Sequence, residues 1–264
     1  MVILKNEIKQ VKKATIIWAV ILSLLIIMML PVYINMVTGG NIPIDNITEN
    51  AFFDSIGTSL EMLMTPMGMY SFLTFFMMTA FSIYGMNLGL GIMTKEYKQS
   101  SADFLMTKPY SRKTIYFSKM MAAALSIVVI GLLFLIASTV AMNLSIDTDF
   151  SLITLGMIAL PMILIPLLFL FLGMLIGTIM PKLRTTIVTS TGVVFLSYAC
   201  GSVSRIAMIN VLRYLSPLHY FNSNQVIKEN AYELNFVFVF ILVCILLILA
   251  GYKIFNKKDI AVVS

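Results

Sequence analysis

Six long stretches without a charged residue constrain the fold of this chain more than any other feature of its sequence. A helix that crosses a bilayer needs about 20 predominantly apolar residues, because hydrocarbon offers no hydrogen-bond partner to an unpaired peptide group. The uncharged stretches run over 14–44, 65–94, 120–146, 150–181, 185–204 and 234–252. We therefore expect an all-α membrane protein, a single transmembrane domain over 1–264, with six transmembrane helices at roughly 14–34, 67–93, 120–142, 151–180, 185–204 and 234–252.

The composition excludes a water-soluble globule. Of the 264 residues, 59% are hydrophobic and only 11% are charged, whereas soluble domains carry about a quarter charged residues. A soluble fold of this size could not hide so many apolar side chains, because its surface must be covered by polar atoms. The solvent of this chain is therefore lipid.

The positions of the charges predict an orientation. Four Lys and Arg precede the first span, six lie between spans 2 and 3, two between spans 4 and 5, and three after span 6, which leaves only three of the 18 for the other side. Eight acidic residues lie on that other side. This asymmetry follows the positive-inside rule and predicts a multi-pass protein of the cell membrane with both termini cytoplasmic. It also explains the net charge of +6 without a nucleic-acid partner.

The N-terminal stretch predicts an amphipathic interfacial helix. Leu4, Ile8 and Val11 recur at helical spacing, whereas Lys5 and Lys9 occupy other faces. Such a helix could lie on anionic lipid headgroups or serve as a docking surface for a cytoplasmic subunit. The apolar run that follows is longer than the 7–15 or so residues of a secretory signal, which favours an uncleaved anchor over a cleaved leader.

The sequence offers no set of residues for catalysis or metal binding. Cys200 and Cys244 lack metal-ligand spacing, and His219 is the only histidine. The spans hold no facing acids or bases that could activate a nucleophile, and no phosphate-binding G-x-x-x-x-G-K-[ST] motif occurs. We therefore expect neither an enzyme nor a cofactor or metal site in this chain.

The connection between spans 2 and 3 is the most informative stretch outside the apolar runs. Phe104 and Leu105 follow Tyr97 at a spacing that gives a short helix one apolar side. Pro109 ends that helix, and Ser111 can cap a second helix that leads into span 3. A helical elbow of this kind transmits a displacement, which a flexible loop would absorb. The alternative interpretation is a solvated loop that its positive charges hold at the membrane interface.

This connection resembles that of the permease subunits of type-2 ATP-binding-cassette (ABC) exporters. Their pattern is E-x-x-x-G-T-x-x-x-L-x-x-x-P-x-S-R-x-x-I-x-x-x-K. The matching residues here are Glu96, Leu105, Pro109, Ser111, Arg112, Ile115 and Lys119. Ser100 and Ser101 stand where the family has Gly-Thr, so the tight turn expected there is altered. The resemblance extends over the whole order of elements, from the N-terminal helix to the segment before span 6.

The resemblance implies a function and partners. A second permease chain, identical or a sister subunit, and a cytoplasmic ATP-binding subunit that carries ATP and Mg are expected. Glu96, Leu105, Pro109, Ser111 and Arg112 would couple ATP hydrolysis to export of a peptide, antimicrobial or lipid-like cargo. Substrate-binding residues stay unknown. The alternative reading is a channel, carrier or non-transporting membrane immunity or sensor protein without an ATPase partner.

Three further features carry expectations about helix contacts. The segment 205–233 interrupts an apolar series with aromatics and a proline, and in this family the corresponding region is re-entrant. The pairs Gly85/Gly89 and Gly173/Gly177 predict close helix contacts, within one chain rather than between chains. Ser and Thr gather in span 5, where they could bond to their own helix or line a route between two subunits. Pro161 and Pro166 should kink span 4.

Overall fold

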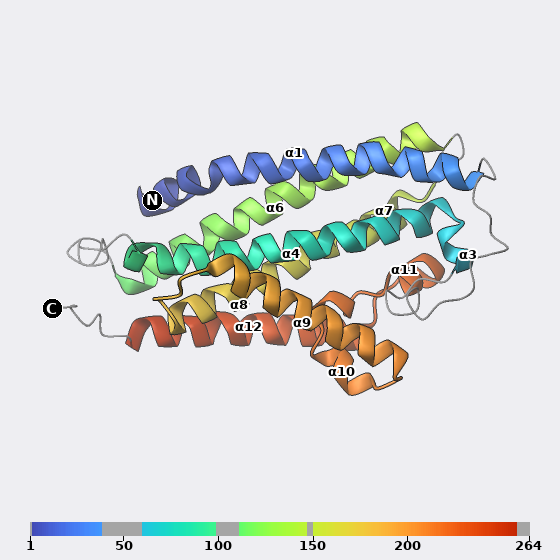
Figure 1. The fold of residues 1–264 in the computed structure, drawn as a ribbon. Helices are drawn as coiled ribbons and strands as arrows, with labels where there is room; N and C mark the ends of the chain where they lie inside the picture. The colour runs from blue at the N-terminus through green and yellow to red at the C-terminus, as the bar shows by residue number, and fades with distance from the viewer. Residues whose placement is uncertain (1, 39–59, 99–110, 147–149, 258–264) are drawn as a thin grey trace.

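The computed structural model describes residues 2–38, 60–98, 111–146 and 150–257, and every regular element within these ranges is a helix. The elements are α1 (Val2–Thr38), α3 (Leu60–Leu63), α4 (Pro66–Lys98), α6 (Arg112–Ser145), α7 (Leu152–Ala159), α8 (Pro161–Ile179), α9 (Thr186–Ile206), α10 (Asn210–Tyr214), η2 (Pro217–His219), α11 (Ser223–Glu229) and α12 (Leu234–Lys257). The long helices run alongside one another in an elongated bundle (Figure 1).

Six helical spans are long and apolar enough to cross a membrane, as the sequence predicts. They cover Ile3–Met36, Pro66–Lys95, Arg112–Ser145, Leu152–Ile179, Thr186–Ile206 and Leu234–Lys257. Several of these helices extend beyond the predicted apolar cores, because polar residues at a helix end continue the same backbone hydrogen bonds without breaking them. The expected all-α membrane protein with six spans is confirmed.

The N-terminal stretch differs from expectation. It is not a separate interfacial helix but the first turns of α1, which runs unbroken over Val2–Thr38. The chain has no glycine or proline before Pro31, so nothing ends a helix between the basic turns and the apolar span. The change from amphipathic to apolar composition marks a change of surroundings, not a boundary of secondary structure.

Span 4 is interrupted where the sequence places its first proline. Helix α7 ends at Ala159 and α8 begins at Pro161, with Leu160 between them. Proline lacks a backbone N–H and its ring excludes the carbonyl one turn earlier, so it starts a helix more readily than it continues one. The helix is therefore divided at Pro161, whereas Pro166, the second proline expected to kink the span, lies inside α8 without ending it.

Helices α4, α6 and α8 form the centre of the bundle, and the predicted glycine contacts lie between two of them. A Cβ atom on Gly85 would stand 2.6 Å from the carbonyl oxygen of Pro166, and one on Gly173 would stand 2.3 Å from that of Met86. Glycine therefore lets α4 and α8 meet backbone to backbone. The preference for contacts within one chain is confirmed.

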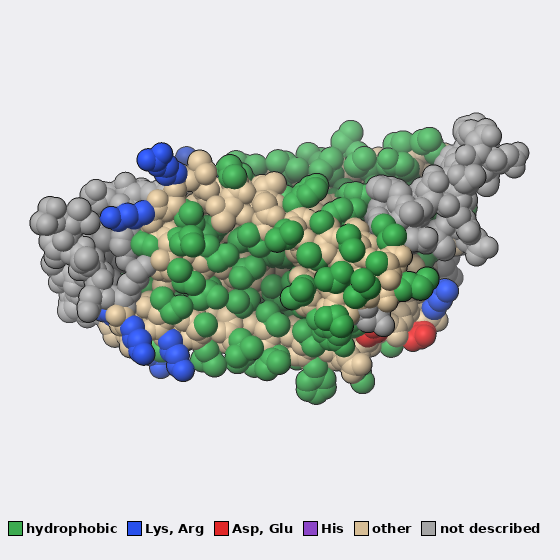
Figure 2. All heavy atoms as spheres, turned by 60° about the horizontal axis from the view of Figure 1, so that its bottom comes forward, with side chains coloured by type: hydrophobic (Ala, Val, Ile, Leu, Met, Phe, Trp, Pro, Cys, Tyr) green, Lys and Arg blue, Asp and Glu red, His purple; other side chains and the backbone are tan. Residues whose placement is uncertain are grey.

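The connections gather at two opposite ends of the bundle. Helix α1 begins and α12 ends at the same end, where α4 also ends, α6 begins and α8 gives way to α9 (Figure 1). Lys and Arg side chains cluster there, and hydrophobic side chains cover the length of the molecule beyond them (Figure 2). We call this end the basic end. The topology thus brings together the charges that the sequence assigns to one side of the membrane.

The segment after α9, which we call the outer segment (residues 207–233), folds back on the bundle. His219 is buried against α9, and its Nδ1 lies 2.9 Å from the hydroxyl of Ser216, which itself lies 2.6 Å from the carbonyl oxygen of Ser197. The Tyr220 hydroxyl donates to the Tyr214 carbonyl at 2.5 Å, and burial raises the pKa of this hydroxyl to about 12. Whether this segment is re-entrant stays a prediction, since that depends on its depth in the bilayer.

The hydroxyl groups of α9 serve the chain's own bundle in several places. Ser190 donates to the Thr186 carbonyl at 2.8 Å, within the same helix. The buried face of α9 consists of Ser190, Val194, Ser197, Gly201 and Ser204. Bonding within the helix is therefore confirmed for Ser190, and a route between two subunits stays a prediction.

Candidate functional site at the basic end

Ser111 starts α6 at the position that the sequence predicts. Its Oγ accepts a hydrogen bond from the backbone N–H of Thr114 at 3.2 Å, and its backbone is extended. The first amide groups of a helix have no partner within the helix, so a serine at the preceding residue stabilises the helix start. The cap fixes the residue at which the connection from α4 becomes rigid.

Arg112, the first residue of α6, joins this helix to the end of α12. Its Nη1 donates to the backbone carbonyl of Asn256 at 2.8 Å. Carbonyl groups in the last turn of a helix lack partners within the helix and carry partial negative charge, which a guanidinium satisfies. A displacement of the start of α6 would therefore also move the end of α12.

The other predicted coupling residues are only partly described. Glu96 lies in the last turn of α4, which ends at Lys98. Leu105 and Pro109 lie outside the described residues. The structure thus places Ser111, Arg112 and the helical turn of Glu96 at the basic end, and leaves untested whether the five act together.

Lys119 connects α6 to α4. Its side chain is almost completely buried, with 1% exposed, and its Nζ donates to the backbone carbonyl of Ile92 at 2.8 Å. A buried ammonium group is tolerated where oxygen atoms replace its water shell. Lys119 therefore fixes the first turns of α6 against the last turns of α4, on either side of the connection.

Glu7 and Lys95 form an ion pair between α1 and α4 that was not predicted from the sequence. Lys95 donates to the Glu7 carboxylate and, at 2.7 Å, to Oε1 of Gln10. Glu7 is buried, with 5% exposed. One feature of the sequence could have indicated an ion pair: Glu7 is the only acidic residue before Asp45 and is surrounded by lysines. Its partner lies 88 residues away, so only the fold could reveal it.

Tyr116 fills the space between α6 and α12. A Cβ atom on Gly251 would stand 2.5 Å from its hydroxyl oxygen, and its ring contacts those of Phe117, Tyr252 and Phe255. Rigid aromatic rings packed in this way leave little room for the two helices to slide. The contact strengthens the link that Arg112 makes at the same end.

These contacts form what we call the basic-end junction: Glu7 with Lys95, Lys119 with Ile92, and Arg112 with Asn256. Together they join α1, α4, α6 and α12 around the connection between α4 and α6. Within the described ranges, no three or more His, Cys, Asp or Glu side chains are grouped as a metal site would require. The arrangement is suited to transmitting movement between helices.

A comparison with protein families decides what kind of chain this is. The family model described as ABC-2 family transporter protein matches residues 1–260. The chain belongs to this ABC-2 family. No curated protein matches it in sequence.

Family membership and fold agree with the resemblance seen in the sequence. The ABC-2 chain is a multi-pass membrane protein with the six spans of a transporter permease. In this family the permease is the membrane component of an ABC system, and membership implies an ATP-binding subunit beside it. The match extends almost from end to end, so the basic-end junction lies wholly within it.

Proposed function

We propose that this ABC-2 chain is the permease of an ATP-driven exporter and is driven by a separate ATP-binding subunit at its basic end. The family match over residues 1–260 carries the proposal. Six of the basic residues of the chain lie between Lys95 and Lys119, in the connection from α4 to α6 and in the helix ends that flank it. By the positive-inside rule this end of the bundle, with both termini, faces the cytoplasm. ATP is available on that side.

The basic-end junction supports a mechanical role for the connection. Nucleotide binding on the partner would displace the segment around Leu105 and Pro109, which α4 and α6 flank at Lys98 and Arg112. Because Lys119 joins these two helices, Glu7 joins α1 to α4, and Arg112 joins α6 to α12, the displacement would move four helices together. The partner would hold ATP and Mg, and this chain would convert the displacement of its connection into a movement of its transmembrane helices.

The cargo and the assembly belong to the same proposal. A second permease chain, identical or related, would complete the pathway. The connections opposite the basic end are too short to hold a receptor domain, which favours export of a peptide, antimicrobial or lipid-like amphipath over capture of a solute from outside. The glycine and hydroxyl positions of α9 that face outward are candidates for the contact between chains.

Purification of the full chain from membranes of its own host tests the proposal. We expect a polypeptide with a G-x-x-x-x-G-K-[ST] motif to co-purify in fixed proportion, and the complex in vesicles to move cargo only with ATP and Mg. Movement of solute by the chain alone, without ATP, would instead support the channel or carrier alternative. A chain purified without any such polypeptide and inactive with ATP would overturn the proposal.

A charge reversal locates the coupling surface. Arg112→Glu should leave expression and insertion intact and lower the amount of ATP-binding subunit retained by about tenfold or more, since like charges at an interface cost several kcal/mol. Lys182→Glu is the matched control, because Lys182 is exposed at the same end but lies between α8 and α9. Equal losses in both variants would mean that net charge, and not the α4–α6 connection, attracts the partner.

A further inference from the structure

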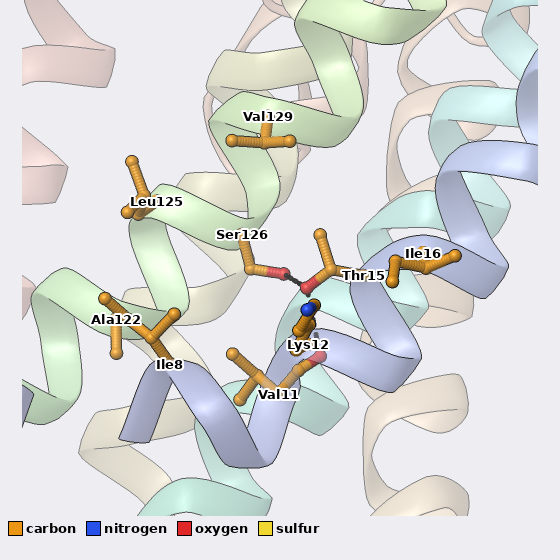
Figure 3. Close-up of a pocket in the computed structure, with 9 residues that line it drawn as sticks. All are labelled: Ile8, Val11, Lys12, Thr15, Ile16, Ala122, Leu125, Ser126 and Val129. Atoms are coloured by element: carbon orange, nitrogen blue, oxygen red, sulfur yellow. Dashed lines mark hydrogen bonds between the residues drawn. The ribbon is translucent and has the colours of Figure 1, made fainter. Parts of the chain in front are cut away.

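A groove of about 230 Å³ opens between α1 and α6 near the basic end. The lining residues come from the first turns of α1 and from the second quarter of α6 (Figure 3). They are Ile8, Val11, Lys12, Thr15, Ile16, Ala122, Leu125, Ser126 and Val129. The groove opens outward, and two of its apolar side chains, Ile16 and Leu125, are 52% and 48% exposed.

The two hydroxyl groups in the groove lining, those of Thr15 and Ser126, are both engaged in hydrogen bonds within the protein. Thr15 Oγ1 donates to the Val11 carbonyl at 3.0 Å, so Ser126 must donate to Thr15 Oγ1, 2.6 Å away (Figure 3). With both hydroxyls paired, the surface offered to an occupant is hydrocarbon. An apolar chain would gain by filling it, and a polar ligand would lose its hydration without compensation.

One positive charge completes the groove. Lys12 is exposed at its edge. A lysine of this kind keeps its ammonium group at the polar boundary while its methylene stem lies along apolar surface. An occupant with a hydrocarbon tail and a negative headgroup therefore matches both parts of the groove.

We propose that the groove between α1 and α6 binds one acyl chain of an anionic phospholipid, with Lys12 holding its phosphate. The groove lies in a chain whose long helices cross a bilayer, at the end where its basic residues meet the headgroups, so such a lipid is at hand. The charge of Lys12 argues against a second copy of this chain as the occupant, because a copy would bring the same basic face. The proposal does not depend on an ATP-binding partner.

The chain carries its own probe for this site. Trp18 is the only tryptophan, and it follows Thr15 by three residues, about 4.5 Å along the helix. It is held in place by the rings of Phe81 and Tyr84. Trp18 is not part of the groove lining, but it lies about one helical turn from Thr15, so bromine atoms on a lipid chain in the groove would come near enough to quench its fluorescence.

The test uses the full chain in phosphatidylcholine vesicles that contain a minor fraction of brominated phosphatidylglycerol or, in parallel, brominated phosphatidylcholine. We expect brominated phosphatidylglycerol to quench Trp18 at about one fifth of the concentration that brominated phosphatidylcholine needs. This is the selectivity that one lysine at the membrane surface provides. Lys12→Gln should abolish the preference, and Lys12→Arg should keep it. Both changes lie on an exposed residue, so folding is not at risk.

Lys13→Gln is the matched control, with the same loss of charge one residue along but outside the groove lining. It should retain the fivefold preference. Equal losses in Lys12→Gln and Lys13→Gln would show general attraction of lipid to the basic face and would overturn the site. Equal quenching by both lipids in the wild type, or no quenching by either because protein covers the groove, would overturn it as well.

Discussion

Gly89 of α4 lies directly against Leu170 of α8, so that a Cβ atom on Gly89 would stand 2.2 Å from the Leu170 carbonyl oxygen. The obstacle is backbone on an adjacent helix and cannot rotate away as a side chain could. In lipid, where apolar burial gives helices little reason to associate, such backbone contact is a main source of helix–helix stability. The contact between α4 and α8 therefore determines how the centre of the bundle is assembled.

Gly89→Ala should destabilise the folded chain by roughly 1–3 kcal/mol, because the added methyl group forces α4 and α8 apart. Gly91→Ala is the matched control: it lies on the same helix, and a Cβ there meets nothing within 4 Å. Alanine at that position should be neutral or stabilising by up to about 1 kcal/mol. Thermal unfolding in detergent measures both, and similar midpoints for the two variants would contradict the close contact.

A double-mutant cycle on Glu7 and Lys95 should show coupling of about 1–3 kcal/mol. Glu7→Gln leaves the ammonium of Lys95 largely buried without its charge partner, and Lys95→Met leaves the carboxylate in the same position. The double variant should therefore lose less stability than the two single changes combined. Lys9→Met, at an exposed position of α1, should change stability by no more than about 0.5 kcal/mol.

Strict additivity of the two single changes would mean that the ion pair does not join α1 to α4 in the membrane. The measurement should be made at two salt concentrations, because a buried pair is screened much less than an exposed one. A coupling energy that disappears at high salt would place the pair in water.

Arg213→Lys should loosen the outer segment even though the charge is kept. Arg213 bonds to both carboxylate oxygens of Glu233, at 2.6 and 2.9 Å, donates to the His219 carbonyl at 3.1 Å, and lies 3.9 Å from the centre of the Phe236 ring. Lysine cannot reproduce the two-pronged geometry or the stacked contact. Amide hydrogen exchange over residues 215–221 should become about tenfold faster; unchanged exchange in the lysine variant would show that charge alone suffices.

Gly201→Ala should displace His219 from its position against α9. A Cβ on Gly201 would stand 2.0 Å from Nδ1 of His219, whereas one on Gly192 of the same helix meets nothing within 4 Å. Gly201→Ala should therefore speed exchange of the amides around His219, and Gly192→Ala should not. Adding His219→Ala to Gly201→Ala should slow the exchange of these same amides again, because it removes the side chain nearest to the new methyl group. Exchange that stays equally fast in the double variant would place the cause elsewhere.

The sequence predicted the elements of the fold better than their boundaries. Apolar runs revealed the six spans, because the thickness of the bilayer imposes a length that composition alone can show. Ser111 was predicted as the cap of the helix at Arg112 because a cap is a local signal. The continuity of α1 could not be predicted, because the amphipathic pattern ends near Ala14 although the helix continues through it.

Most contacts between helices could not be predicted from the sequence. Glycine spacing predicted a close approach within the chain, but not that α8 is the partner of Gly89. The pair of Glu7 and Lys95 joins residues from the first and second spans, and no local pattern records such a distance. Leu105 and Pro109, the centre of the predicted elbow, lie outside the described residues, so their role stays a prediction.

The unbroken course of α1 has a geometric consequence. Its 37 residues make a rod about 55 Å long, whereas the hydrocarbon layer is about 30 Å thick. Even when tilted, the rod must protrude into water on at least one side. A twist applied to its lysine-rich tip would therefore travel along α1 from the basic end as far as Pro31, where the missing backbone hydrogen bond weakens the helix.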